Sequence, residues 1–430
     1  MECHQRIARL SWMVVAGSIW ALGGLSVVPA DEPVTPAQAR DMGSRLEAKL
    51  ERLTEINPRS RDLDERGAVR VPRLPRVSFV GPPVLERAID CDVGQSITHT
   101  LSRAVARRVV LHLSGTCRES VTIDRPGVTL TGARSGTAVI DPPEDGEGIP
   151  IGPAIYAIGA HELTLEDLTL RGGTFGLEAY ASRRVQLTRV NAIENTECGD
   201  SCTWPQGVYL NASEAVISDS SLSNNTSPLW VDQNSTAVVS DTVMENNSGD
   251  GPFSMSNSFL SLSRCRLLGN GLGPQAATYS STRVYDSVVG SAGYNGWTAA
   301  WNTSELRIFR TEIHGRIQGT QDSQVRLGGV QFGTSSPYDI IQLNLSSNLF
   351  ITDSSRDGSP VIGEINGNIN LWAFSTATIQ AEGVINGSIA LYDFSDVDAW
   401  FTPILGSVEC ASRSRAFCNP HPLGGVHGCE

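Results

Sequence analysis

A short motif that recurs about every 22 residues between residues 154 and 335 constrains the fold more than any other feature of the sequence. Each copy is short and rich in β-branched residues, and none contains an apolar run long enough for a helix. The steps between successive copies are 22, 30, 22, 23, 22, 24 and 19 residues, and a period in this range indicates a solenoid. The anchor residues of the copies are Leu165, Leu187, Ile217, Val239, Leu262, Val284, Ile308 and Leu327.

The residues at fixed offsets from the anchors predict which kind of solenoid forms. The fifth residue after each anchor is apolar and would form one wall of a core, whereas the third is mostly small. The eighth is Asn in four copies, and Asn tolerates the left-handed conformation of a tight corner and can form amide ladders between layers. We therefore expect an all-β, right-handed parallel β-helix with about 22 residues per turn. The fifth-position residues are Leu170, Ala192, Leu222, Met244, Leu267, Val289, Ile313 and Phe332, and the corner residues are Asn195, Asn225, Asn247 and Asn270.

Four segments follow from composition. Residues 1–30 combine an early positive charge, an apolar run and a small-residue cleavage site, which predicts a signal peptide, with an uncleaved anchor as the alternative. Residues 31–84 hold a predicted amphipathic helix over 35–57 and a proline-rich linker. Residues 85–405 are the predicted β-helix, which begins with a short cap helix, and residues 406–430 are a Cys-rich tail. The sequence thus predicts a secreted, periplasmic or cell-surface protein without a transmembrane helix in the mature chain, and leaves its oligomeric state open.

Charge limits the partners of this chain. The formal net charge is −13, removal of residues 1–30 makes it −14, and Lys49 is the only lysine. Such a chain repels nucleic acids, so we expect no nucleic-acid partner. The sequence shows no evident basic groove, so a neutral or weakly charged glycan is the expected ligand.

The run from Cys91 through Ser-Gly-Thr-Cys117 to Val128-Thr-Leu-Thr-Gly132 resembles the N-terminal start of secreted right-handed β-helix proteins of the pectate-lyase-like superfamily. That superfamily contains lyases, hydrolases, esterases, epimerases and adhesins, so the resemblance implies a fold and not an activity. It also implies that a ligand would lie along the first sheet of each turn, in a groove between inserted loops.

Aromatic and acidic residues recur on the predicted strands of that first sheet. If Leu210, Val231 and Met255 point inward, alternation places their neighbours, including Ser254 and Ser256, on the outer face. Sugar rings pack on exposed aromatic faces, although aromatic residues also favour strands for packing alone. The predicted glycan-binding residues are Glu178, Tyr180, Tyr209, Trp230, Asp232 and Trp301.

Eight cysteines remain after residues 1–30, and an oxidising compartment would pair them. We expect Cys91 to pair with Cys117, Cys198 with Cys202 and, as the preferred tail pair, Cys410 with Cys418. The partner of Cys429 stays open, and Cys265 falls in the small-residue column, which indicates a buried thiol. The histidines and cysteines of the tail match no usual zinc spacing, so no metal and no cofactor are expected.

Two functions remain open from the sequence. The first is a secreted β-helix that binds polysaccharide along the aromatic face, with cleavage by a lyase or hydrolase mechanism undecided. Glu178 and Asp232 would lie two turns apart, and the paired-Asp and Gly-His-Gly signatures of polygalacturonase-type enzymes are absent from the sequence. The alternative is a non-catalytic structural or adhesion solenoid at the cell surface.

Overall fold

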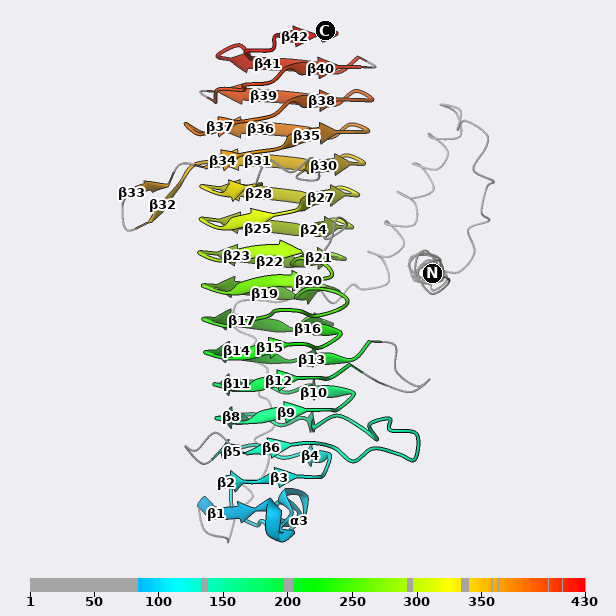
Figure 1. Ribbon diagram of the computed structural model, residues 1–430, viewed down its shortest axis with the longest axis vertical. Helices are drawn as coiled ribbons and strands as arrows, with labels where there is room; N and C mark the ends of the chain where they lie inside the picture. The colour runs from blue at the N-terminus through cyan, green and yellow to red at the C-terminus, as the bar shows by residue number, and fades with distance from the viewer. Residues whose placement is uncertain are drawn as a thin grey trace, which may run out of the picture. The chain divides into compact units, whose positions relative to one another are not determined.

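The computed structural model describes residues 84–132, 138–196, 204–291, 297–333, 340–356, 359–361, 363–400, 402–411 and 413–429. These residues all belong to the second of two compact units, Ser78–Glu430. The predicted signal peptide, the helix over 35–57 and the Cys198–Cys202 pair lie outside the described residues. The described chain is a right-handed parallel β-helix, in which strands from successive turns stack into long ladders (Figure 1).

Three parallel sheets form the faces of the β-helix, and a small antiparallel hairpin projects from one side (Figure 1). Sheet C consists of β4 (Val121–Ile123), β7 (Ile155–Ile158), β10 (Phe175–Tyr180), β13 (Gln206–Asn211), β16 (Ser227–Asp232), β18 (Phe253–Ser254), β21 (Gln275–Ala277), β24 (Trp297–Trp301), β27 (Arg316–Thr320), β30 (Ile340–Asn344), β35 (Asn368–Leu371), β38 (Ile389–Leu391), β40 (Val408–Cys410) and β42 (Val426–His427). Sheet A consists of β1 (Val84–Asp90), β2 (Arg108–Ser114), β5 (Val128–Gly132), β8 (Thr164–Glu166), β11 (Val185–Thr188), β14 (Glu214–Ser218), β17 (Thr236–Ser240), β19 (Phe259–Ser263), β22 (Ser281–Tyr285), β25 (Glu305–Phe309), β28 (Gln324–Gly328), β31 (Asn348–Thr352), β36 (Thr376–Gln380), β39 (Asp396–Trp400) and β41 (Arg415–Asn419). Sheet B is in two parts, β3 (Thr116–Cys117), β6 (Val139–Ile140), β9 (Thr169–Arg171), β12 (Asn191–Ile193) and β15 (Ser221–Ser223), then β20 (Arg266–Asn270), β23 (Val288–Ser291), β26 (Glu312–His314), β29 (Gln331–Phe332), β34 (Glu364–Ile365) and β37 (Val384–Ile385); the hairpin is β32 (Ser354–Arg356) with β33 (Ser359–Val361).

The predicted core columns are confirmed. All eight fifth-position residues, from Leu170 to Phe332, are at most 1% exposed and belong to one continuous core. The predicted asparagine corner is also confirmed, because the side-chain oxygen of Asn225 accepts from the backbone N–H of Asn195 at 3.1 Å and the same contact joins Asn247 to Asn270. Each amide thereby satisfies backbone groups that would otherwise be buried without partners.

A second ladder, made of serine hydroxyls, runs along the corner between sheets C and A and was not predicted from the sequence. The hydroxyl of Ser213 accepts from the backbone N–H of Ser182 at 3.0 Å, and Ser235 does the same for Ser213. All of these serines are at most 4% exposed, and together they stabilise the turn in each layer. The buried serines of this corner are Ser182, Ser213, Ser235, Ser258, Ser280, Ser304, Ser323, Ser347, Ser375, Ser395 and Ser414.

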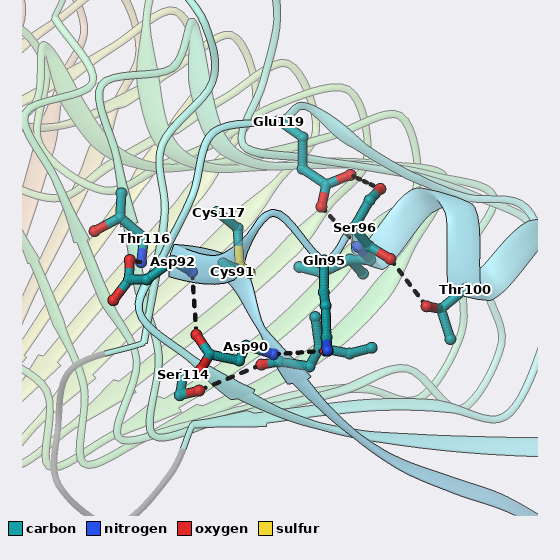
Figure 2. The surroundings of a disulfide bond; sticks show 12 residues. Asp90, Cys91, Asp92, Gln95, Ser96, Thr100, Ser114, Thr116, Cys117 and Glu119 are labelled. Atoms are coloured by element: carbon teal, nitrogen blue, oxygen red, sulfur yellow. Dashed lines mark hydrogen bonds between the residues drawn. A yellow bond between two sulfur atoms is a disulfide. The ribbon is translucent and has the colours of Figure 1, made fainter.

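A short cap covers the N-terminal end of the solenoid (Figure 2). It comprises the 3-10 helix η2 (Cys91–Val93) and the helix α3 (Ile97–Arg103), and the predicted Cys91–Cys117 disulfide joins η2 to strand β3. The Glu119 carboxylate accepts from the Ser96 hydroxyl at 2.9 Å and from the Ile97 N–H at 2.7 Å. This carboxylate satisfies groups that the start of α3 leaves without helical partners, so the first turns and the cap hold one another in place.

The C-terminal end differs from the expected tail. Strands β40, β41 and β42 add to the two long sheets, so residues in the 406–430 range form the last layers of the solenoid (Figure 1). Cys410 bonds to Cys429, whereas Cys418 is a buried free thiol, so the predicted Cys410–Cys418 pair is wrong. Parallel pairing brings β40 beside β42, while Cys418 lies on β41 in the other sheet. Sequence proximity therefore misled the assignment.

The remaining cysteine agrees with the prediction, because Cys265 is a buried free thiol. Across the described residues, no cluster of His, Cys, Asp and Glu is arranged to hold a metal ion. No helix in this part of the chain is long and apolar enough to cross a membrane. The two disulfides between described cysteines fit an oxidising, extracellular environment.

Candidate functional site

The outer face of sheet C aligns the predicted site residues in two neighbouring columns. Glu178 of β10 pairs in register with Tyr209 of β13, which pairs in turn with Trp230 of β16. Two positions further along the same strands, Tyr180 pairs with Asn211 and Asn211 pairs with Asp232. Because these side chains alternate with buried core residues, all of them face outward and are partly exposed.

The next strand corrects the predicted inward and outward positions. Phe253, not Ser254, pairs with Trp230 and continues the outer column, whereas Ser254 is fully buried and its hydroxyl lies 2.8 Å from that of Thr282. Strand β18 has only two residues and ends before Ser256, which has a φ of 55°. A strand this short has no alternation that the sequence can reveal. The expected outward position of Ser254 is therefore wrong, and Met255, which was expected to point inward, is partly exposed.

Aromatic rings follow one another over this face in two groups of contacting side chains. Tyr180 contacts both Tyr156 and Tyr209 with ring centroids 5.8 Å apart. Further along, Phe253 contacts Trp230 at 4.8 Å and Trp301 at 6.2 Å, in edge-to-face arrangements in both cases. We call this set the aromatic ladder: Tyr156, Phe175, Tyr180, Tyr209, Trp230, Phe253 and Trp301. Sequence reasoning found four of its members as site residues, whereas it did not identify Phe253 or Phe175, whose ring lies 5.8 Å from that of Tyr209.

Polar side chains lie between the rings, and two of them form hydrogen bonds with tyrosine hydroxyls. The Tyr180 hydroxyl donates to the Glu178 carboxylate at 2.9 Å, and the Asn211 amide donates to the Tyr209 hydroxyl at 3.0 Å. Burial raises the pKa of Glu178 above its ordinary value, against the opposing effect of the Tyr180 hydrogen bond. Burial also raises the pKa of Tyr209, with a contribution from the charge of Asp232. The face therefore presents fixed donors and acceptors beside apolar rings.

A third acid of this region, Asp250, was not predicted. Asp250 lies in the turn before β18, its carboxylate accepts from the Gln275 amide at 3.4 Å, and burial raises its pKa. Gln275 pairs in register with Phe253 and is only 1% exposed, although it occupies the outer column. The sequence Asp250-Gly-Pro-Phe253 marks a turn leading into a strand, and this was the only available signal.

The spacing of the carboxylates limits what the face can do chemically. Glu178 and Asp232 are two layers apart and two residues apart along the strand, which places their backbones about 12 Å from each other. An inverting pair of carboxyl groups needs about 6.5–9.5 Å and a retaining pair needs less. The arrangement therefore suits binding and orientation of a ring-bearing ligand better than acid–base hydrolysis by this pair.

Trp204 is 41% exposed just before β13, at the end of the insert that lengthens one repeat. The predicted disulfide-closed part of that insert, including Cys198 and Cys202, lies outside the described residues. The polar atoms at the start of the neighbouring strands are deeply buried, because Gln206 is 4% exposed and Ser227 is fully buried. Phe175 of the aromatic ladder pairs in register with Gln206 at this end of the face.

Comparison with known proteins agrees with the fold. A family model described as a right handed beta helix region matches residues 149–289. The A-module of mannuronan C-5 epimerase AlgE4 from Azotobacter vinelandii is 16% identical, with a TM-score of 0.39 over 72% of this chain and 92% of that chain. The A-module of AlgE6 from the same organism is 14% identical, with a TM-score of 0.40 over 77% of this chain and 93% of that chain. A pectin methylesterase in complex with a hexasaccharide is 14% identical, with a TM-score of 0.27 over 67% of this chain and 80% of that chain. No curated protein matches the sequence at a significant level. The family match agrees with the β-helix fold over the residues that it covers.

Proposed function

We propose that the outer face of sheet C binds a polysaccharide that lies along the axis of the solenoid. The aromatic ladder carries this proposal, because rings on successive layers offer a series of apolar platforms at a regular spacing. Sugar rings present apolar faces that pack on such platforms, and their hydroxyls need the kind of fixed donors and acceptors that Glu178, Asn211 and Asp232 provide.

Packing between aromatic residues alone explains less of this arrangement than ligand binding does. Cross-strand packing stabilises a sheet whether or not a ligand binds. Here, however, carboxylate and amide groups are interspersed with the rings, and burial of Glu178 without a charged partner costs stability. Energetically costly polar groups placed beside partly exposed rings favour a binding surface over a purely structural one.

We propose binding without hydrolysis by the Glu178–Asp232 pair, because the backbones that carry the two carboxylates are about 12 Å apart, a wide separation for a pair that acts on one glycosidic bond. The ligand class supported by this face is a neutral or weakly charged glycan, since tyrosine, tryptophan and amide groups predominate and the nearby charges are acidic.

A glycan array with the purified chain tests the proposal, together with Trp230→Ala and Tyr209→Ala variants. We expect each substitution to weaken binding by about 1–3 kcal/mol, the usual contribution of a packed aromatic side chain. Phe374→Ala is the matched control, because this exposed aromatic residue lies in a turn away from the aromatic ladder. Unchanged binding in both ladder variants would place the ligand elsewhere, and no glycan binding at all would favour the adhesion scaffold.

A further inference from the structure

Three arginines stand side by side on the outer face of sheet A. Arg283 of β22 pairs in register with Arg307 of β25, which pairs with Arg326 of β28. Each side chain is partly exposed and alternates with buried core residues. We call these three residues the arginine stripe.

Aromatic rings border the arginine stripe on both sides. The Arg283 guanidinium lies over the Phe259 ring at 5.0 Å, and the Arg326 guanidinium lies over the Phe350 ring at 5.1 Å. Beside the stripe, Tyr285 and Phe309 are stacked with centroids 5.7 Å apart and planes at 13°. The guanidinium groups are therefore held in fixed positions on a surface that is part apolar.

The positive side chains on this surface outnumber the negative ones. Glu305 contacts Arg307 at 2.6 Å and Arg326 at 3.3 Å, so one carboxylate serves two arginines. Among the described residues, no carboxylate lies within ion-pair distance of Arg283. Like charges at opposed positions of adjacent strands destabilise a sheet, and the stripe has two such contacts.

Other arginines of the solenoid are arranged differently. Arg264 makes two hydrogen bonds to Asp241, at 2.7 and 2.6 Å, and Arg415 makes two to Asp396, at 3.0 and 2.8 Å. These pairs are each bidentate and locally neutral. The arginine stripe thus differs from these two bidentate pairs, in a chain whose formal net charge is −13.

We propose that the arginine stripe is a second binding site, which takes a carboxylate-bearing polysaccharide running along the solenoid axis. Successive layers repeat at about 4.8 Å, which is close to the length of one sugar unit in a chain. A polymer with one carboxylate per sugar would then present one charge per layer, and a guanidinium can grip a carboxylate with two parallel hydrogen bonds.

Charge density distinguishes this ligand from a nucleic acid. Duplex DNA carries one charge per about 1.7 Å and a single strand one per about 3.4 Å, which is denser than one arginine per layer. The excess negative charge of the chain also repels a dense polyanion more strongly than a sparse one. A single-stranded oligonucleotide is therefore the competing ligand in the test.

The test measures binding of polygalacturonate and of its fully methyl-esterified form to the whole chain, by calorimetry at low salt. In the triple variant Arg283→Gln, Arg307→Gln, Arg326→Gln we expect binding of polygalacturonate to weaken at least tenfold. The esterified polymer should bind no more weakly to the variant than to the wild type. Arg264→Gln is the matched control, because it removes a paired arginine from the same side of the solenoid, and it should leave binding within twofold.

A second variant separates a binding role from misfolding. Replacing the three arginines by lysine keeps the charge but removes the planar fork, so we expect a partial loss, between the wild type and the glutamine variant. Polygalacturonate binding that is unchanged in both triple variants, or lost equally in Arg264→Gln, would overturn the proposal. So would tighter binding of a single-stranded oligonucleotide than of polygalacturonate. A loss seen only in Trp230→Ala would assign the acidic polymer to sheet C, and this outcome is independent of whether sheet C binds neutral glycans.

Discussion

The outer faces of sheets C and A rest on the same stack of layers but offer different chemistry. On sheet C, rings alternate with carboxylates and amides, and burial raises the pKa of Glu178. On sheet A, guanidinium groups of the arginine stripe lie between aromatic rings with one carboxylate among them. In a β-helix, residue types at outward-facing positions can change while those at inward-facing positions stay the same, because alternate side chains of a strand never share a face. One solenoid can therefore carry two surfaces for different ligands.

Removal of one asparagine side chain from the corner tests whether a structural change beneath one face leaves the other face intact. We expect Asn225→Ala to lower the free energy of unfolding by about 3 kcal/mol, because buried N–H and C=O groups lose their partners. Chemical denaturation measures this. Because each layer contacts only its neighbours, binding on sheet C should weaken while binding to the arginine stripe stays the same. An equal loss on both faces would contradict this separation.

Ionic strength should separate the two faces next. Binding to three arginines releases counterions, so raising salt from 50 to 200 mM should weaken polygalacturonate binding about twentyfold. Neutral glycan binding on sheet C should change less than twofold over the same range. Calorimetric titrations at four salt concentrations measure both slopes, and equal slopes would mean that the two faces do not differ in this way.

A single methyl group should disturb the sheet A face alone. A side chain at Gly328 would meet a carbon of the Phe309 ring at 2.3 Å, so Gly328→Ala must displace the ring beside the arginine stripe. We expect a loss of about 1–2 kcal/mol in stability, measured by thermal unfolding. Gly146→Ala is the control, because nothing lies within 4 Å of its added carbon. Equal effects of the two substitutions would show that Phe309 is not held against Gly328.

The pH dependence of stability should be the smallest difference, and it has opposite signs on the two sides. Burial raises the pKa of Glu178, so its contribution is fully present below its ordinary pKa of 4.5 and is lost as pH rises through the raised value. The Arg264 hydrogen bond lowers the pKa of Asp241, next to strand β17 of sheet A, so its contribution is present above 3.8 and is lost as pH falls.

Thermal unfolding across pH with Glu178→Gln and Asp241→Asn measures these contributions. The first variant should remove a decline in stability above roughly pH 5, and the second a decline below roughly pH 4. Identical difference profiles for the two variants would contradict the assigned causes.

The sequence by itself determined the solenoid, its core columns and its asparagine corner, because a repeat of about 22 residues leaves a parallel stack as the arrangement that buries every apolar position. It also placed Glu178, Tyr209 and Trp230 on one outer face, since strands of six residues preserve a readable alternation. The arginine stripe was visible in principle: each arginine directly precedes an anchor, at Val284, Ile308 and Leu327. The stripe was not predicted because a formal net charge of −13 for the whole chain does not show where positive side chains cluster.

Tertiary structure alone decided what depends on contacts between distant layers. Strand β18 is too short for its parity to be read, so only its pairing with β16 and β21 shows that Phe253 extends the aromatic ladder. The pairing of Cys410 with Cys429 required β40 to lie beside β42, whereas Cys418 is closer in sequence. The raised pKa of Glu178 arises from burial, which depends on how the neighbouring layers pack around its side chain. A repeat pattern fixes which face a side chain occupies, but its neighbours, and hence its chemistry, depend on the register of the stacked turns.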